Sequence, residues 1–420
     1  MLKIFKQKSV FVKNVTTLVT GTAISQIINI LSTPILTRIY SPGEFAVFQI
    51  FYSVAAIISV VATLRFEYAI VAPKEEEEAL DIISICFYSS FVIAILSLLI
   101  LLFWRFKSGN SGNFNSWYFL IPVYVVFAGL MQSLNFLSLR RQSFKLNLAA
   151  RISSVLATAI GGIGLGMAGL KPAGLIIGNV LGQFTGFIVL LRKIPNVLLR
   201  PFHRIANMKE TFIRHKNYPL FNAPHALVDT FQDQGITFVL NYYFTANIVS
   251  FYGQGFRILK APIGFIGSSI YQVIYPKFTE MSHQGIDLRS HVKKIYLQLL
   301  LLGLPFFTLL WFFATPIFRV FFGEKWAGAG EIAGVMAPWL FLNFIVSPVS
   351  CFALIRNKQR KAMMITIIEI ILRFSAIIIG GIYGSYMLGF KLLTIAGCGI
   401  MIYALIWYYQ LSAVPKTEIA

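Results

Sequence analysis

Several ionisable residues stand inside long apolar stretches of this sequence, with spacings that place them together on a helix. Asp229 and Asp233 are four residues apart and therefore share one helix face. Because neighbouring carboxylates disfavour ionisation of both, the pair suits a proton or cation site, or a ligand for sugar hydroxyls. Pairing with a basic residue of another helix is the simpler alternative. His225 lies one turn earlier, where it could transfer a proton or serve as a hydrogen-bonded structural residue.

Two further pairs of charged residues each contain at least one basic side chain. Arg257 and Lys260 are three residues apart, so their like charges repel unless an anion lies near. That anion is either a carboxylate of a neighbouring helix or an anionic substrate, for which the planar fork of arginine suits phosphate. Glu369 and Arg373 are four residues apart, with the glutamate first, and this order favours an ion pair within one helix.

A third group of candidates stands apart from these pairs. Arg65 and Glu67 lie about 200° apart around a helix, so we expect no direct pairing; Arg65 would face a cavity and Glu67 would bond to another helix. Arg151 either lines the same cavity or extends its charged end to the membrane surface. Three amides that could line a polar cavity are Gln26, Asn29 and Asn222.

The sequence predicts no metal site, no cofactor and no enzymatic activity. Cys86, Cys351 and Cys398 all lie in apolar runs without the spacing of metal ligands. The sequence contains no G-x-x-x-x-G-K-[ST] phosphate-binding loop, no G-x-S-x-G motif of serine hydrolases and no H-E-x-x-H motif of zinc proteases. Energy for any transport must then come from an ion gradient or from consumption of the cargo.

Composition indicates which elements position these residues. Of 420 residues, 57% are hydrophobic and 12% are charged, whereas soluble domains average about 25% charged residues. So few charges cannot cover the surface of a soluble protein, which excludes a cytosolic enzyme, a disordered chain and a nucleic-acid-binding domain despite the net charge of +20. The class predicted is an all-α polytopic membrane protein.

Twelve transmembrane helices are expected, because that many segments approach the roughly 20 apolar residues that a span requires. Both termini are predicted to be cytoplasmic, since most of the 36 Lys and Arg residues then fall on the cytoplasmic side. The basic segment 192–216 divides the chain into six-helix lobes at 1–191 and 217–420. The predicted spans are 15–37, 44–72, 80–104, 117–138, 146–169, 173–191, 217–244, 248–275, 293–317, 329–354, 362–384 and 390–411.

Four segments carry a resemblance to a known family. Residues 22–45 (TAISQIINILSTPILTRIYSPGEF) and 64–79 (LRFEYAIVAPKEEEEA) resemble the first two spans of bacterial polysaccharide exporters. Residues 218–232 (YPLFNAPHALVDTFQ) and 251–280 (FYGQGFRILKAPIGFIGSSIYQVIYPKFTE) resemble their seventh and eighth spans. The chain is thus similar to the Wzx-type O-antigen or oligosaccharide flippases of the multidrug/oligosaccharidyl-lipid/polysaccharide exporter superfamily. It departs from them at Ala46, where the family commonly has glycine.

The resemblance implies two lobes around a central cavity, in the bacterial inner membrane. It implies a lipid-linked oligosaccharide on undecaprenyl diphosphate as cargo, moved from the cytoplasmic to the periplasmic leaflet for lipopolysaccharide O-antigen or a related glycan. A cavity with cationic side chains would stabilise the diphosphate, and the acidic residues Glu67, Asp229, Asp233 and Glu369 are candidates for ion coupling. A glycan polymerase and a chain-length regulator are the partners that the family implies, together with membrane lipids.

Three other functions compete with this one. A cation-coupled multidrug antiporter of the same superfamily would share the helical bundle but prefer an acidic cavity. A membrane glycan polymerase would need catalytic residues on a long outer loop, which the predicted spans do not leave room for. A flippase for the peptidoglycan precursor shares the chemistry, but it is expected to have fourteen spans rather than twelve.

Overall fold

A computed structural model of the protein describes residues 2–73, 75–108, 115–192 and 205–413. Within these residues every regular element is helical and no strand occurs. The contacts divide the chain into two compact units, Met1–Gly235 and Ile236–Ala420. The all-α class predicted from composition is therefore confirmed.

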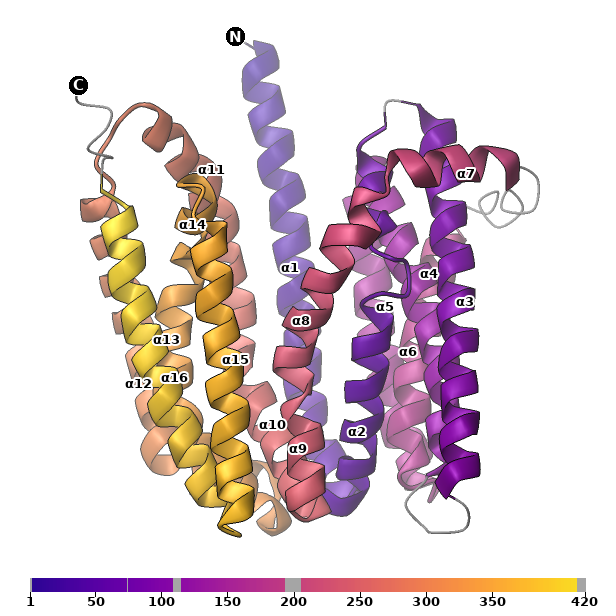
Figure 1. The fold of residues 1–420 in the computed structure, drawn as a ribbon, viewed down its shortest axis with the longest axis vertical. Helices are drawn as coiled ribbons and strands as arrows, with labels where there is room; N and C mark the ends of the chain where they lie inside the picture. Colours follow the sequence, from indigo (N-terminus) through magenta and orange to yellow (C-terminus); the bar gives the residue numbers. More distant parts are fainter. Residues whose placement is uncertain (1, 74, 109–114, 193–204, 414–420) are drawn as a thin grey trace. The chain divides into compact units, whose positions relative to one another are not determined.

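The N-terminal unit is built mainly from long helices (Figure 1). Its elements are α1 (Leu2–Ile39), α2 (Pro42–Ser59), η1 (Phe66–Val71), α3 (Glu76–Ser108), η2 (Ser116–Leu120), α4 (Ile121–Arg140), α5 (Phe144–Met167), α6 (Ala173–Leu191), α7 (Ile205–Arg214), η4 (Tyr218–Asn222) and α8 (Ala223–Gln234).

The C-terminal unit repeats this construction with its own long helices. Its elements are α9 (Ile236–Tyr243), α10 (Ala246–Pro262), η5 (Ile263–Gly267), α11 (Ser268–His283), α12 (Arg289–Phe322), η6 (Glu324–Trp326), α13 (Ala327–Val346), η7 (Ser347–Cys351), α14 (Phe352–Ile355), α15 (Gln359–Ile382) and α16 (Tyr386–Leu411).

Nine helical segments of the described chain are long and apolar enough to cross a membrane. They overlap predicted spans two to six and nine to twelve, although the segment in span two ends at Ser59. The segments are Pro42–Ser59, Glu76–Lys107, Ser116–Arg140, Phe144–Met167, Ala173–Leu191, Arg289–Phe322, Glu324–Ile355, Gln359–Ile382 and Tyr386–Leu411.

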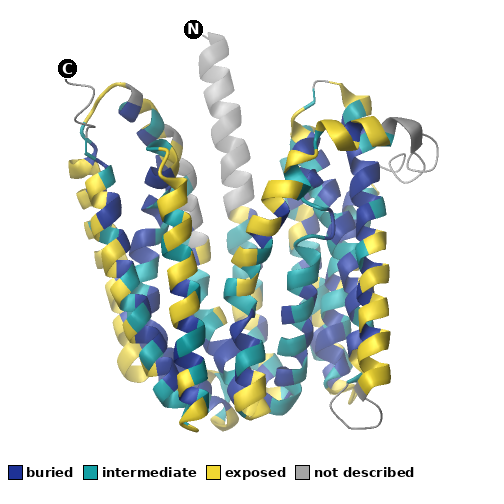
Figure 2. Ribbon diagram, in the orientation of Figure 1, coloured by how far each residue is buried: buried dark blue, intermediate teal, exposed yellow. Residues whose placement is uncertain are grey.

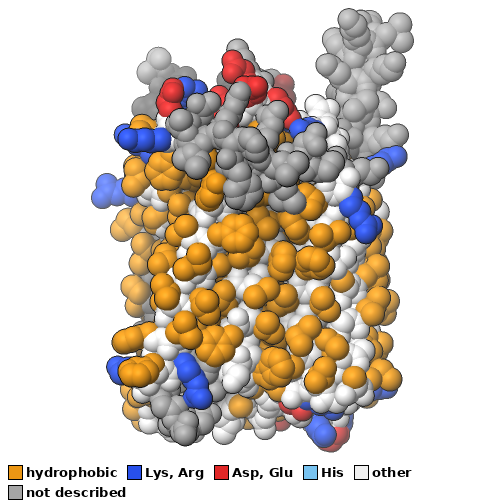
Figure 3. Space-filling view, turned by 90° about the vertical axis from the view of Figure 1, so that its right-hand side faces the viewer, with side chains coloured by type: hydrophobic (Ala, Val, Ile, Leu, Met, Phe, Trp, Pro, Cys, Tyr) orange, Lys and Arg blue, Asp and Glu red, His pale blue; other side chains and the backbone are white. Residues whose placement is uncertain are grey.

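The outward face of α3 shows the surface that such helices present. Ile100, Phe103 and Phe106 are all more than 60% exposed, while Ile82 and Ile83 near the start of the helix are fully buried. Exposed and buried residues alternate along the helices in Figure 2. Figure 3 shows hydrophobic side chains covering the middle of one face, with charged side chains near its two ends. A surface with so many exposed apolar side chains between two charged ends is suited to contact with lipid hydrocarbon rather than with water.

Close backbone contact holds α5 against α6. A Cβ added at Gly178 would lie only 2.7 Å from the backbone nitrogen of Gly162, so no side chain fits there. The hydroxyl of Tyr40 donates to the carbonyl oxygen of Gly162 at 2.7 Å and ties the end of α1 to the same seam. The glycine-rich segment 161–169 therefore serves helix packing, as small residues do in membrane bundles.

The predicted spans 44–72, 217–244 and 248–275 are each interrupted, so the continuous helix assumed across 44–72 is wrong. In the first, α2 ends at Ser59, and Leu64 and Arg65 adopt positive φ angles of 50° and 64° before η1 begins. In the second, the π-helical turn η4 contains a proline and precedes α8 and the short α9. In the third, Pro262 is followed by the π-helical turn η5. Proline cannot donate the helical hydrogen bond, so the backbone rearranges around it.

Candidate functional site

The break after α2 brings Arg65 and Glu67 together. Glu67 is fully buried, and its Oε1 accepts hydrogen bonds from Nη1 of Arg65 at 3.2 Å and Nε2 of Gln132 at 2.6 Å. The hydroxyl of Thr63 donates to its other oxygen. The guanidinium of Arg65 also lies over the ring of Tyr68, 5.3 Å from the centroid. A buried carboxylate is stable only when its oxygens are bonded in this way.

The expectation that Arg65 and Glu67 could not pair is therefore wrong. It assumed a continuous helix, in which residues two apart diverge. The left-handed backbone at Leu64 and Arg65 reverses that divergence and lets the two side chains meet. The second half of the expectation is confirmed, because Gln132 on α4 bonds to Glu67.

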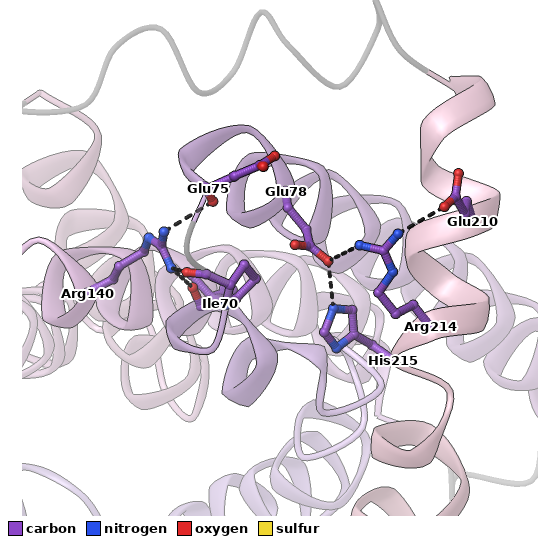
Figure 4. A network of polar contacts seen from close by, with 8 residues as sticks. Ile70, Glu75, Glu78, Arg140, Glu210, Arg214 and His215 are labelled. Carbon is purple, nitrogen blue, oxygen red and sulfur yellow. Dashed lines mark hydrogen bonds and ion pairs between the residues drawn. The ribbon is translucent and has the colours of Figure 1, made fainter.

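A polar network closes this broken segment at one end of the unit (Figure 4). Arg140, at the end of α4, donates to the carbonyl oxygens of Ile70 and Glu75, each at 3.1 Å. Glu78, in the first turns of α3, accepts from Arg214 at 2.9 Å and lies 3.2 Å from Nε2 of His215. The acidic segment that begins α3 thus fastens this helix to neighbouring elements.

The same network gives structure to the segment expected to be a basic linker. The helix α7 lies across the end of α3 in Figure 1. Its Phe212 ring contacts the ring of Phe66, with centroids 5.1 Å apart, and Thr211 is buried beneath it. Hydrogen bonding to Glu78 raises the pKa of Arg214, which lies outside the membrane-spanning segments. The part of the linker at 193–204 lies outside the described residues.

Arg151 has a different environment from Arg65. It is exposed on α5, and its Nη1 donates to the hydroxyl of Thr22 on α1. The described residues place no carboxylate within ion-pair distance of it. Gln26 and Asn29 follow Thr22 by one and two turns, so the three share one face of α1. Gln26 is half-buried and Asn29 is exposed.

The candidates on α8 and η4 are mostly accessible. Asp229 is exposed and its Oδ2 lies 3.3 Å from Nδ1 of His225, one turn earlier. Asp233 is half-buried, and the neighbouring Gln234 accepts a hydrogen bond at 3.0 Å from Ser53 of α2. Asn222 is exposed at the end of η4. The structure therefore pairs Asp229 with His225 of the same helix, a contact that the sequence analysis did not predict.

In the C-terminal unit, Glu369 and Arg373 are buried on α15, and the predicted ion pair is present. Nη1 of Arg373 lies 3.9 Å from Oε1 of Glu369; Arg373 is 2% exposed and Glu369 is 6% exposed. The guanidinium also lies over the ring of Trp339 on α13, 4.7 Å from its centroid. Its Nε and Nη2 have no hydrogen-bond partner among the described residues. The pair is thus supported by an aromatic face rather than by a full set of acceptors.

The two cations of α10 differ in accessibility. Arg257 is exposed, whereas Lys260 is half-buried with its Nζ 5.1 Å from the centroid of the Phe256 ring. Phe256 in turn stacks on Trp339, with centroids 6.3 Å apart. The aromatic packing therefore links Lys260 and Arg373 within this unit.

Sequence reasoning missed several of these partners. Gln132 is a polar residue within a predicted span, so its position alone could have marked it. Trp339 carried no such signal, because aromatic residues are common in every span. Glu331 was also missed, although it lies inside the predicted span 329–354. In the described part of the chain, no group of three or more His, Cys, Asp or Glu residues could hold a metal ion.

Solved structures share this arrangement of helices. The lipid II flippase MurJ in an inward closed conformation has a TM-score of 0.73 at 14% identity, covering 93% of this chain and 87% of its own. An inward-facing multidrug resistance MATE family transporter of the MOP superfamily has a TM-score of 0.68 at 13% identity, covering 96% and 99%. At such identities the similarity establishes the fold, which is that of the polytopic MOP-type membrane proteins.

Sequence comparison identifies the family. The family described as "Polysaccharide biosynthesis protein" matches residues 35–331, which is more than half of the chain. The succinoglycan biosynthesis transport protein ExoT of Rhizobium meliloti (strain 1021) is 22% identical over 339 residues. That match covers 77% of this chain and 64% of the relative, so less than two thirds of the relative's length is spanned.

The chain belongs to the polysaccharide biosynthesis protein family. The resemblance of its sequence to the Wzx-type flippases is confirmed. With nine helical segments of its described residues long and apolar enough to cross a membrane, it is a multi-pass membrane protein.

Proposed function

We propose that the protein is a flippase for an undecaprenyl-diphosphate-linked oligosaccharide, the O-antigen repeat unit. It would move this cargo from the cytoplasmic to the periplasmic leaflet of the bacterial inner membrane by alternating access. In this proposal twelve transmembrane helices form two six-helix lobes, at 1–191 and 217–420, around a central cavity, with both termini cytoplasmic. Membership of the family, a transport protein as relative and a flippase among the structural neighbours support it.

The observation that carries the proposal is the environment of Arg151. Its guanidinium is charged at every physiological pH, is exposed, and bonds to a hydroxyl instead of a carboxylate. Its planar fork matches two phosphate oxygens. Arg151 is seven residues into α5, about 10 Å along the helix, so a lipid diphosphate at the cytoplasmic surface would reach it.

The polar face of α1 extends the proposed site toward a sugar chain. Gln26 and Asn29 follow Thr22 along the helix, and their amides offer both donors and acceptors to hydroxyl groups. Asn222 on η4 is proposed for the same role. The isoprenoid tail would remain in the hydrocarbon, outside the polar cavity.

The remaining basic candidates would contribute to diphosphate binding to different extents. Arg257 and Lys260 would supply a second cationic position for the diphosphate. Arg65 and Arg373 would contribute less, because each already pairs with a buried glutamate and adds little net charge.

Asp229 is the proposed coupling group. It is exposed and adjacent to His225, so it can exchange protons or cations with water. Asp233 would assist it on the same face. Glu67 and Glu369 are weaker candidates, since each is buried and already lies within ion-pair distance of an arginine.

Complementation of a deletion strain tests the proposal. Wild-type protein should restore surface polysaccharide, and Arg151→Ala should lower it by about tenfold or more, because a lost charge-assisted hydrogen bond costs about 1.5–3 kcal/mol. Arg151→Lys should retain part of the activity. The matched control is Lys145→Ala, which removes an exposed charge from the first turn of the same helix.

The location of the lipid-linked unit distinguishes the alternatives. Trapping on the cytoplasmic side of the deletion strain supports flipping. A unit that reaches the periplasmic leaflet but stays unpolymerised would contradict it and favour a glycan polymerase. Unchanged surface glycan with raised drug sensitivity would favour a cation-coupled multidrug antiporter, for which the exposed Asp229–His225 pair is the supporting observation.

A further inference from the structure

A cavity of about 170 Å³ lies between α12 and α13 of the C-terminal unit, and none of the residues that line it belongs to the proposed transport site. Two glycines of α13 create the close approach around it. A Cβ added at Gly330 would lie 2.6 Å from the Cα of Thr315, and one at Gly334 would lie 3.3 Å from the carbonyl oxygen of Trp311. The cavity is therefore formed by the packing of these two helices and needs no other element.

The polar groups that line this cavity are hydrogen-bond acceptors. Glu331 contributes a carboxylate and Thr315 a hydroxyl. Pro316 follows within α12 and has no N–H, so the carbonyl of Phe312, four residues before it, receives no helical hydrogen bond. Trp311 adds an aromatic ring that is half exposed. Acceptors beside an aromatic face are the surroundings that bind an ammonium group.

Glu331 has no partner within the described part of the chain. The nearest basic residue in sequence on α12, Arg319, is bonded at 3.0 Å to Glu324 outside the cavity. Glu331 lies four residues into α13, about 6 Å along the helix. It therefore lies near the boundary between headgroups and hydrocarbon, and the exposed side chain of Phe312, which also lines the cavity, offers an apolar surface to acyl chains.

We propose that this cavity binds the primary ammonium of a membrane aminophospholipid. The carboxylate of Glu331, the hydroxyl of Thr315 and the carbonyl of Phe312 would accept its three N–H donors, and Trp311 would cover its charge. A quaternary ammonium lacks those donors and binds less well, and an anionic headgroup is repelled. The proposal concerns lipid binding and does not depend on which cargo is transported.

Native mass spectrometry of the full chain tests this inference. The protein is reconstituted with equal amounts of phosphatidylethanolamine, phosphatidylcholine and phosphatidylglycerol of the same acyl composition, and the retained lipids are counted. Wild type should retain phosphatidylethanolamine preferentially. Glu331→Gln should reduce that preference about tenfold, the loss expected for a hydrogen bond to a charged group. The matched control, Glu324→Gln, removes an exposed carboxylate at the same end of α13 but outside the cavity and should leave it unchanged.

A second variant separates binding from folding. Thr315→Val keeps the volume of the side chain and removes only the hydroxyl, so it should weaken retention less than Glu331→Gln while preserving the melting temperature. Equal retention of all three lipids by wild type, or an unchanged preference in Glu331→Gln, would overturn the proposal. If free ethanolamine stabilises detergent-solubilised wild type but not Glu331→Gln, while no lipid preference appears, the site takes soluble amines instead.

Discussion

Two buried arginine–glutamate pairs, one in each unit, are held in contrasting ways. Arg65 and Glu67 meet across an irregular turn, and three donors saturate the glutamate. Glu369 and Arg373 sit one turn apart on a continuous helix, 3.9 Å from each other, with Trp339 against the guanidinium. The first pair depends on a strained backbone and on α4, whereas the second follows from helical spacing. Residue types alone therefore do not tell how firmly a buried charge is held.

Glu67→Ala should have the largest effect. It removes a fully buried carboxylate and leaves the charge of Arg65 and the amide of Gln132 without their acceptor. Breaking a buried pair in this way costs about 3–5 kcal/mol. We expect a large fall in the melting temperature of the purified protein and in its yield from membranes. A melting temperature equal to wild type would show that the cluster contributes nothing to the fold.

Glu369→Ala should destabilise the protein less. The 3.9 Å separation is too long for a direct hydrogen bond, and Trp339 continues to stabilise the cation after the carboxylate is lost. We expect a cost of about 2 kcal/mol, measured by the same thermal unfolding. The double variant Glu369→Ala with Arg373→Met should recover part of the loss. If Glu369→Ala destabilises the protein as much as Glu67→Ala does, the two pairs do not differ in how much they stabilise the fold.

Glu78→Gln should have the smallest effect, because its partners Arg214 and His215 lie at a wet surface, where salt bridges contribute little. The expected change is local: the amides of α7 should exchange hydrogen several-fold faster, while the melting temperature is nearly preserved. Glu75→Gln is the matched control, since the network uses only the backbone carbonyl of Glu75. Faster exchange in both variants would show that acidic charge in general, and not the contact with α7, orders this helix.

The comparison also shows where the sequence was informative. Four-residue spacing predicted the pair at 369/373, because both residues lie on one uninterrupted helix. The same reasoning failed at Arg65 and Glu67, where two consecutive non-glycine residues adopt left-handed conformations that local propensity disfavours. The prolines within predicted spans seven and eight carried a signal for interruption, but not for the π-helical turns that accommodate them.

The sequence by itself determined the class of protein and, among the described residues, nine helices that are long and apolar enough to cross a membrane. These features depend on composition and on periodicity within one segment. The partners of Glu67, the docking of α7 on α3 and the cavity beside Glu331 were decided by tertiary structure alone. Each joins residues from different elements, so it depends on backbone breaks and on close approach between helices, and local sequence patterns encode neither.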